Sequence, residues 1–300
     1  MKKIALWAMC IAVMVLSGCR KAPEWKAEHV FVIGLDGWGA YSVAKADMPN
    51  VKALMDAGCY TLKKRSVLPS SSAVNWASMF MGAGPELHGY TEWGSRTPEL
   101  PSRVLNEHGI FPTVFSELRK AAPDAEMGVL YEWDGIKYLV DTLALNHHAQ
   151  APDYNTHPTA LCDMACEYIM QKKPVLSAFC FDNPDHVGHG AGHDTPEYYA
   201  KLKELDGYVG RIVDAIKEAG IYENSIIIVT ADHGGINKGH GGKTMEEMET
   251  PFIIAGKNIK KGGAFEESMM QFDCASTIAS VFNLEQPQVW IGRPMTQVFE

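Results

Sequence analysis

Carboxylate side chains follow three apolar stretches of this sequence. Asp36 comes directly after the first stretch, Asp182 and Asp185 follow the second, and Asp232 and His233 follow the third. Carboxylates placed in this way can hold metal ions or move protons. If the three stretches are parallel strands, their acidic side chains meet at the carboxyl edge of one sheet. Open α/β sheets form their sites at that edge.

Histidine is concentrated in the same two later regions. His186, His189 and His193 are predicted to lie in one short loop, and His233 and His240 in another. Neutral imidazole and carboxylate are the ligands that zinc and related divalent ions prefer. These groups outnumber the ligands of one four-coordinate ion. The sequence therefore predicts a pair of divalent ions, which in such sites lie roughly 3.5–4 Å apart.

A candidate nucleophile lies in the sequence PSSSAVN at residues 69–75, just before an apolar helical segment. A hydroxyl at a helix N-terminus meets unsatisfied N–H groups and the positive end of the helix dipole. Both favour an alkoxide or a bound phosphate. One of these serines could equally serve only as the N-cap of the helix, and spacing leaves both roles open.

Alternating strands and helices must position these groups. Strand-like segments cover 29–35, 126–131, 175–181, 225–230 and 252–255, and helical patterns cover 48–57, 72–81, 112–122, 158–172, 196–219 and 274–282. This alternation predicts an α/β fold with a doubly wound, mainly parallel sheet and helices on both faces. Segments 84–110 and 134–157 carry many turn residues, so we expect loops over one edge of the sheet.

The first 28 residues are predicted to lie outside this fold. The chain starts MKK, continues with a short apolar run and reaches LSGC at residues 16–19, which resembles a bacterial lipobox. We expect residues 1–18 to be a lipoprotein signal peptide, Cys19 to carry lipid, residues 19–28 to form a tether and 29–300 to form a single domain. This predicts export and anchoring in the bacterial envelope, facing the periplasm. An ordinary secretory signal or a short anchor helix is the alternative.

Composition excludes several classes of protein. The 300 residues are 46% hydrophobic and 21% charged, which is typical of a globular chain and not of a disordered or fibrous one. The formal charge of −9 argues against a nucleic acid duplex as partner, because duplex binding needs positive charge. Nothing in the sequence determines the oligomeric state.

Five segments, in the correct order, resemble the alkaline phosphatase superfamily, in particular its nucleotide pyrophosphatase/type I phosphodiesterase branch. They are residues 32–37 (VIGLDG), 68–89 ending in PELHG, 184–189 (PDHVGH), 230–235 (TADHGG), and 273–282 followed by GRPM at 292–295. The last segment resembles the closing helix and strand of the family. The resemblance covers residues 29–300 with few insertions. It implies an alkaline phosphatase-like hydrolase domain with a minimal cap.

This resemblance implies two metal sites and a nucleophile. The first ion would be held by Asp36, Ser72, Asp232 and His233, and the second by Asp185, His189 and His240. Ser72 takes the place of the usual threonine nucleophile. Asn75 matches an asparagine that holds a non-bridging phosphate oxygen. His193 is the alternative to His240 as a ligand, and the ligand types accept manganese as well as the expected zinc.

The activity implied is hydrolysis of phosphodiester or pyrophosphate bonds in a small phosphate ester, through a covalent phospho-serine at Ser72. A phosphomonoesterase, a phosphoethanolamine-type transferase and a non-catalytic lipid-anchored binding protein are the alternatives. The spacing of His240 from His233 resembles the transferase branch, whereas Asn75 favours diesters. Residues 70–74 lack the proline and arginine of the sulfatase segment, which argues against a sulfatase. Ala73 replaces a phenylalanine of the family's nucleotide pocket.

Four aromatic residues are candidates for substrate binding: Tyr90, Trp93, Tyr131 and Trp133. Aromatic rings beside a phosphate site can stack on a base or a sugar. The same rings could serve only to pack the loops that carry them.

Overall fold

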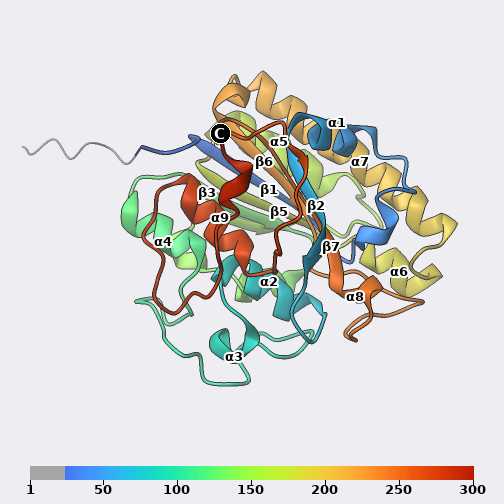
Figure 1. The fold of residues 1–300 in the computed structure, drawn as a ribbon, viewed down its shortest axis with the longest axis horizontal. Coiled ribbons are helices and arrows are strands. Elements are labelled where there is room, and N and C mark those ends of the chain that lie inside the picture. Colours follow the sequence, from blue (N-terminus) through green and yellow to red (C-terminus); the bar gives the residue numbers. More distant parts are fainter. Residues whose placement is uncertain (1–23) are drawn as a thin grey trace, which may run out of the picture.

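One eight-stranded sheet organises the protein in the computed structural model, which describes residues 24–300 (Figure 1). The strands follow the order β4-β3-β5-β1-β6-β7-β2-β8. Strand β7 runs antiparallel to β6 and β2, and the other neighbouring pairs are parallel. The predicted α/β class with a mainly parallel sheet is therefore confirmed.

The central strands are buried on both sides, as parallel strands covered by helices must be. The strands are β1 (His29–Leu35), β2 (Cys59–Arg65), β3 (Met127–Tyr131), β4 (His147–Gln150), β5 (Leu176–Phe181), β6 (Ser225–Thr230), β7 (Glu249–Gly256) and β8 (Gly263–Ala264). Strand β1 pairs with β5 on one side and with β6 on the other, so the three carboxyl ends lie next to one another.

Helices cover both faces of the sheet. Helices α2 (Ser72–Met81), α4 (Val114–Ala121) and α9 (Asp273–Val281) pack into one apolar core, and α1 (Pro49–Ala57), α5 (Ala160–Lys172) and α7 (Pro196–Glu218) pack into the other. The short helices are α3 (Pro85–His88), α6 (Asp185–Ala191) and α8 (Met245–Met248), and there are 3-10 turns at Ala40–Ser42, Asp134–Tyr138, Thr142–Ala144, Tyr222–Asn224 and Thr296–Val298. Each layer buries an apolar helix face that would otherwise meet water.

Several elements differ from the sequence prediction. Strand β2 was not predicted, because its second half reads Lys63-Lys64-Arg65 and lacks an apolar run. Strand β4 lies inside segment 134–157, which was expected to be a loop. The histidines after β5 were also expected in a loop, but α6 carries two of them. Residues 292–295 form no strand, so the expected closing strand is absent there.

The structure describes only the last part of the N-terminal segment that was predicted to lie outside the fold. Residues 1–18 and Cys19 lie outside the described residues, so the signal peptide and the lipid anchor stay predictions. Residues 24–28, placed in the tether, contact the domain: the Lys26 N–H donates to the Val281 carbonyl, and Trp25 packs edge-on against Phe282. No helix within residues 24–300 is both long and apolar enough to cross a membrane.

Candidate metal centre

The three predicted carboxylates meet at the carboxyl ends of β5, β1 and β6. Asp36 directly follows β1, Asp185 begins α6 after β5, and Asp232 follows β6. Gly37 brings them close together. Gly37 has a φ of +70°, which L side chains rarely adopt. A Cβ at this position would also lie only 2.5 Å from the Cβ of Asp185, so no side chain fits here. The Gly37 N–H then donates to Asp232 Oδ1 at 3.2 Å.

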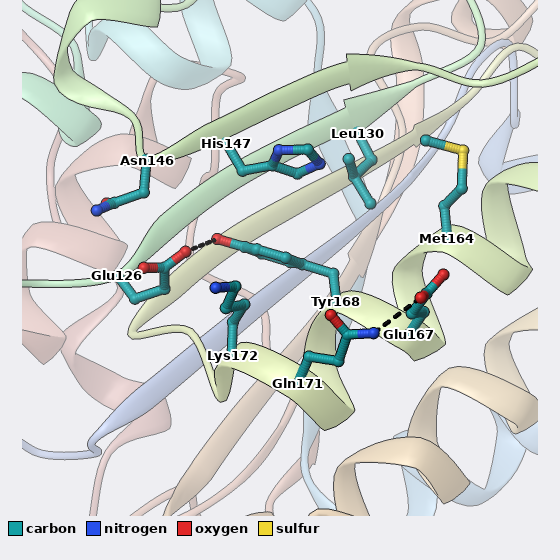
Figure 2. A pocket seen from close by; sticks show the side chains of 9 residues that line it. All are labelled: Glu126, Leu130, Asn146, His147, Met164, Glu167, Tyr168, Gln171 and Lys172. Atoms are coloured by element: carbon teal, nitrogen blue, oxygen red, sulfur yellow. Dashed lines mark hydrogen bonds between the residues drawn. The ribbon is translucent and has the colours of Figure 1, made fainter.

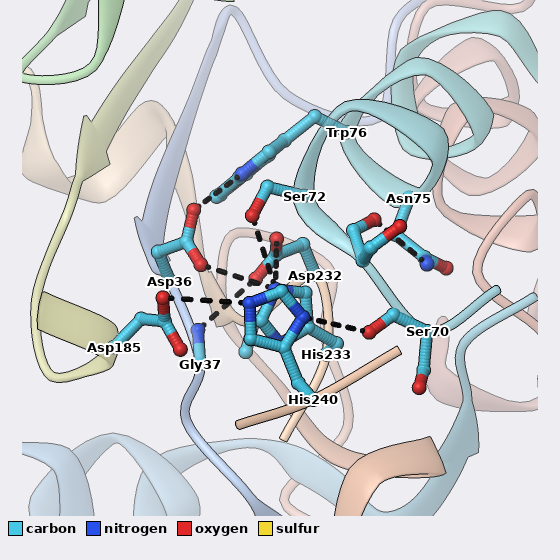
Figure 3. Close-up of polar contacts among 12 residues, drawn as sticks. Asp36, Gly37, Ser70, Ser72, Asn75, Trp76, Asp185, Asp232, His233 and His240 are labelled. Carbon is cyan, nitrogen blue, oxygen red and sulfur yellow. Dashed lines mark hydrogen bonds and ion pairs between the residues drawn. The ribbon is translucent and has the colours of Figure 1, made fainter. Parts of the chain in front are cut away.

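One group of ligand-type atoms surrounds the Nε2 atom of His233 (Figure 3). Asp36 Oδ1 lies 3.4 Å from this nitrogen, Asp232 Oδ2 lies 3.3 Å away and Ser72 Oγ lies 3.1 Å away. All four side chains are buried. These are the four residues that the sequence assigned to the first metal, and the fold brings them to one point.

A second group lies beside the first. Asp185 Oδ2 is 3.0 Å from His189 Nε2 and 3.7 Å from His240 Nε2, and the two imidazole nitrogens are 3.2 Å apart. Asp185 and His189 stand one turn apart on α6, so they share a face of that helix. Asp185 also has a carboxylate oxygen within 4.8 Å of ligand-type atoms of Asp36 and His233. It therefore lies between the two groups.

The histidines of both groups are held in one tautomer. Nδ1 faces the Lys238 carbonyl in His189, the Gly234 carbonyl in His233 and the Ser70 carbonyl in His240, at 2.7–3.1 Å. A carbonyl can only accept, so each Nδ1 carries a proton and each Nε2 faces inward, where it offers a lone pair once it is deprotonated. Metal-bound histidines are oriented in this way. Two lone pairs facing each other at 3.2 Å, as in His189 and His240, repel unless a proton or a cation lies between them.

The donor set therefore fits divalent metal ions. Asp36 Oδ1 and Asp232 Oδ2 are buried without any hydrogen-bond partner, a costly state for carboxylate oxygens unless a cation meets them. Among residues 24–300, the groups of three or more such ligands are Asp185-His189-His240 and Asp36-Asp185-His233. Carboxylate and imidazole together are ligands of zinc and of neighbouring transition metals.

Burial and mutual repulsion perturb the pKa values of these groups. Burial, reinforced by Asp232 and Asp185, raises the pKa of Asp36 well above its usual range, and burial raises that of Asp232 to about 7. Burial would also raise the pKa of Asp185, but hydrogen bonds from His189 and His193 hold it well below its usual range. The bond to Asp185 raises the pKa of His189 to about 9.

We expect the metal-free protein to lose stability as the pH rises from about 6.5 to 9. Raised pKa values mean that the folded chain binds these protons more tightly, so their stabilisation is lost as the pH passes the folded pKa. Asp36, Asp232 and His189 all act in this direction, and Lys64, whose pKa burial lowers to about 8, opposes the fall only above about pH 8. Burial lowers the pKa of His233, and that of His240 to about 4, so their contribution is already constant above about 6.5.

Thermal midpoints measured with a chelator across this range check the prediction. Saturating zinc should remove most of the fall, because zinc binds the deprotonated ligands. A midpoint of the chelated protein that rises between pH 6.5 and 9 would contradict it.

Two serines at the start of α2 correspond to the two roles that the sequence left open, the N-cap and the hydroxyl that could act as nucleophile. Ser71 occupies the N-cap position without a side-chain capping bond, and Ser72 is the first residue of the helix. Because His233 Nε2 presents a lone pair, the Ser72 hydroxyl donates to it. Ser72 is thus the hydroxyl that faces the ligand cluster.

The prediction for Asn75 needs correction. Its Oδ1 accepts from the Val67 N–H at 2.7 Å, and its Nδ2 lies 3.1–3.2 Å from the carbonyls of Val67, Pro69 and Ser71. The amide is fully buried. It therefore ties loop 67–71 to helix α2 and has no free donor for a phosphate oxygen. The sequence could not separate these roles, because an asparagine in the first turn of an apolar helix suits both.

Replacing Asn75 with alanine should destabilise the protein. The loop would lose its side-chain bonds, and the buried Val67 N–H would lose its acceptor. We expect the free energy of unfolding to fall by about 2–3 kcal/mol. Urea unfolding of the metal-free variant measures this loss. An unchanged unfolding free energy with a selective loss of turnover would instead favour a direct role at the phosphate.

The four aromatic candidates lie in different surroundings. The Trp93 carbonyl accepts from the N–H of Ala73, the residue after Ser72, and its indole is 68% exposed. Tyr90 is buried and donates its hydroxyl to the Tyr138 carbonyl. Tyr131 is also buried, and Trp133 is partly buried against the core. Of the four, Trp93 is the one that combines a backbone hydrogen bond to the residue after Ser72 with an exposed side chain.

Two further residues lie near the candidate ligands: Trp76, which the sequence prediction missed, and His193, which it gave only as an alternative ligand. The Nε1–H of Trp76 donates to Asp36 Oδ2, and His193 Nε2 lies 3.3 Å from Asp185 Oδ1. His193, the alternative to His240 as a ligand, thus contacts a ligand of the second group. His186 is exposed and packs edge-on against Tyr154. The period-two alternation of β1 puts Gly34 on the same side as Asp36, the only signal that could have suggested a partner there.

A cavity of about 600 Å³ lies elsewhere, between α5 and the strands β3 and β4 (Figure 2). Its polar groups are partly engaged: Tyr168 donates to Glu126, and Gln171 donates to Glu167. None of the predicted site residues lines it. The ligand cluster at the strand ends is the better candidate for chemistry, because it combines buried carboxylates, inward imidazoles and a hydroxyl, which this cavity does not.

Several known proteins are similar in sequence to this chain. Relatives include an uncharacterised pyrophosphatase/phosphodiesterase of Schizosaccharomyces pombe, 24% identical over 68% of this chain and 44% of its own length. Venom phosphodiesterase 2 of Crotalus adamanteus is 23% identical over 73% of this chain and 28% of its own. The human GPI ethanolamine phosphate transferase 2 catalytic subunit is 30% identical over 39% of this chain and 12% of its own. The match spans less than half the length of these relatives.

Solved structures share the fold. Inactive murine ectonucleotide pyrophosphatase/phosphodiesterase 5 in complex with AMP superposes with a TM-score of 0.75 at 15% identity, covering 91% of this chain and 100% of that one. A 2-O GAG sulfatase superposes with a TM-score of 0.72 at 16% identity, covering 91% and 74%. The model of the type I phosphodiesterase/nucleotide pyrophosphatase family matches residues 30–274. The chain therefore belongs to this family, within the alkaline phosphatase superfamily.

Proposed function

We propose that this protein hydrolyses phosphodiester or pyrophosphate bonds with two divalent metal ions, most simply zinc, and with Ser72 as the nucleophile. The observation that carries the proposal is the placement of Ser72 Oγ, 3.1 Å from His233 Nε2 and beside buried carboxylates that lack partners. Family membership supplies the reaction class.

The residues of the two groups would hold the ions. Asp36, Ser72, Asp232 and His233 would hold the first, and Asp185, His189 and His240 the second. When bound, such ions lower the pKa of a neighbouring hydroxyl and neutralise charge that develops on phosphoryl oxygens.

Ser72 would carry the group being transferred. Its Oγ forms a bond to phosphorus while the P–O bond to the leaving alcohol or phosphate breaks, and the leaving group takes up a proton equivalent to the one that the serine gave up. A water oxygen then bonds to the same phosphorus, the Oγ–P bond breaks, a proton of that water restores the Ser72 hydroxyl, and the phosphate product leaves. As the first residue of α2, Ser72 stands at the positive end of a ten-residue helix, which favours the negative phosphoryl group.

The exposed Trp93 indole would contact the organic part of the substrate. Its backbone carbonyl accepts from the N–H of the residue after Ser72, so this exposed residue is anchored beside the nucleophile. A flat aromatic surface there suits a base, a sugar or another planar group. Tyr90 and Tyr131 are too deeply buried to offer such a surface.

A comparison of two model substrates tests the reaction class. We expect the zinc-loaded protein to show a larger kcat/KM for bis-p-nitrophenyl phosphate than for p-nitrophenyl phosphate. A preference for the monoester would instead make this protein a compact phosphomonoesterase. A protein that binds no metal and turns over neither substrate would support a binding protein on a hydrolase fold.

A transferase is the second candidate. Two observations favour it: His240 follows His233 by only seven residues, and part of the chain is similar to a GPI ethanolamine phosphate transferase subunit. The same phospho-serine would then pass its group to an alcohol in place of water. Product analysis with an added alcohol acceptor separates the two, because a transferase yields the new diester as its main product.

A further inference from the structure

The two carboxylate oxygens of Asp36 have different surroundings. Oδ1 has no hydrogen-bond partner and lies 3.4 Å from His233 Nε2, inside the ligand cluster. Oδ2 accepts a hydrogen bond of 3.0 Å from Trp76 Nε1 (Figure 3). The indole thus occupies one oxygen and leaves the other for the ligand cluster.

Trp76 is held rigidly in this position. Its ring is almost completely buried and stacks on Phe80, with ring centres 6.0 Å apart. The ring lies directly on Gly34 of β1, where a Cβ would fall 2.3 Å from Cη2. Gly34 and Asp36 are two residues apart, so they face the same side of the strand. The missing side chain at Gly34 gives the indole room to reach Asp36.

Helix α2 connects this contact to the nucleophile. Ser72 and Trp76 stand four residues apart, which places both on one face of the helix. Ser72 Oγ approaches His233, and the Trp76 indole approaches Asp36. A single rigid helix therefore sets the position of the hydroxyl relative to the carboxylate of the first group.

We propose that Trp76 is a positioning residue for the first metal ion, which it orients through Asp36. The proposal rests on the metal centre proposed above. Groups that hydrogen-bond to a metal ligand commonly affect metal affinity by about 10–100-fold, because they fix the ligand in its binding geometry. The Trp76 N–H contacts Asp36 Oδ2 and not the Oδ1 that lies in the ligand cluster, so its effect on the ion would pass through Asp36.

The substitution Trp76→Phe tests this role, since it keeps an aromatic ring over Gly34 and removes the N–H. Trp290→Phe is the matched control. Trp290 is also buried, and its Nε1 donates to a backbone carbonyl, that of Pro112, at 3.0 Å. Zinc affinities are measured by competition with a chelator of known affinity, and thermal midpoints are measured on the metal-free variants.

We expect wild-type protein and W290F to bind two zinc ions tightly. W76F should bind one with wild-type affinity and the other about 10–100-fold more weakly. Wild-type affinity for both ions in W76F would overturn the assignment. Equal weakening in W76F and W290F would also overturn it, because it would reflect general destabilisation. A wild-type protein that binds no zinc would overturn the proposed function itself.

If W76F does not fold, the wild-type protein still decides the question by NMR with ¹⁵N-labelled tryptophan. The hydrogen-bonded Trp76 indole N–H should exchange slowly with solvent and shift on addition of zinc. A spectrum in which no slowly exchanging indole signal responds to zinc would overturn the proposal.

Discussion

Replacing Ser72 with alanine is expected to abolish turnover while both metal ions stay bound. Loss of the attacking oxygen should lower kcat by on the order of 10³-fold or more, because no other group can form the covalent intermediate. Three ligand-type side chains, those of Asp36, Asp232 and His233, still surround the first position. Zinc content and diester hydrolysis are measured on the same preparation.

Ser71→Ala is the matched control for this variant. Ser71 is adjacent and buried, and its hydroxyl has no hydrogen-bond partner. We expect S71A to keep near wild-type turnover and metal content. Wild-type-like rates from S72A would exclude Ser72 as the nucleophile, whatever the control shows.

Replacing Asp185 with asparagine is expected to weaken both metal sites. Asp185 is part of the second group and also lies within 4.8 Å of Asp36 and His233 of the first, so its charge acts on both positions. The amide keeps the shape of the side chain but removes the negative charge. We expect fewer than one tightly bound zinc per chain and a fall in kcat/KM of on the order of 10²-fold or more.

Two companion variants make the Asp185 result specific. His189→Ala should loosen only the second ion, because His189 contacts Asp185 and His240 but no residue of the first group. His186→Ala should change neither ion, since this neighbouring side chain is exposed. Two tightly bound zinc ions in D185N would contradict the shared position of Asp185.

The sequence predicted the central sheet well because buried parallel strands are nearly continuous apolar runs. Strands β1, β5 and β6 have this character, and each is followed by a carboxylate. The topology then places Asp36, Asp185 and Asp232 together without any further information, since β1 pairs with both neighbours. Local pattern and global fold agree most closely at this part of the molecule.

The prediction failed where tertiary contacts override local pattern. Lys64 belongs to a run of charges that suggests an exposed turn, yet it is fully buried in β2. Its Nζ donates to the Ala231 carbonyl and to Gln271 Oε1, and burial lowers its pKa to about 8. No local signal in a run of three basic residues marks the one that turns inward.

Asn75 and Trp76 show the same limit within the site. Both follow Ser72 on one short helix, and the resemblance to the family pointed to Asn75 as the functional partner. In the structure, the Asn75 side chain hydrogen-bonds to the backbone of the loop at Val67, and the Trp76 indole donates to Asp36. These roles depend on which way each side chain faces, and on the space left by Gly34. Sequence spacing alone does not contain that information.

The covalent step at Ser72 can be examined directly by rapid acid quench and peptide mass analysis. The zinc-loaded protein is mixed with bis-p-nitrophenyl phosphate, quenched during the first turnovers and digested. The account predicts a p-nitrophenylphosphoryl group on the peptide that contains Ser72, and no such adduct in S72A. Rapid turnover without any adduct, together with an active S72A, would contradict the central claim and would require direct attack by water.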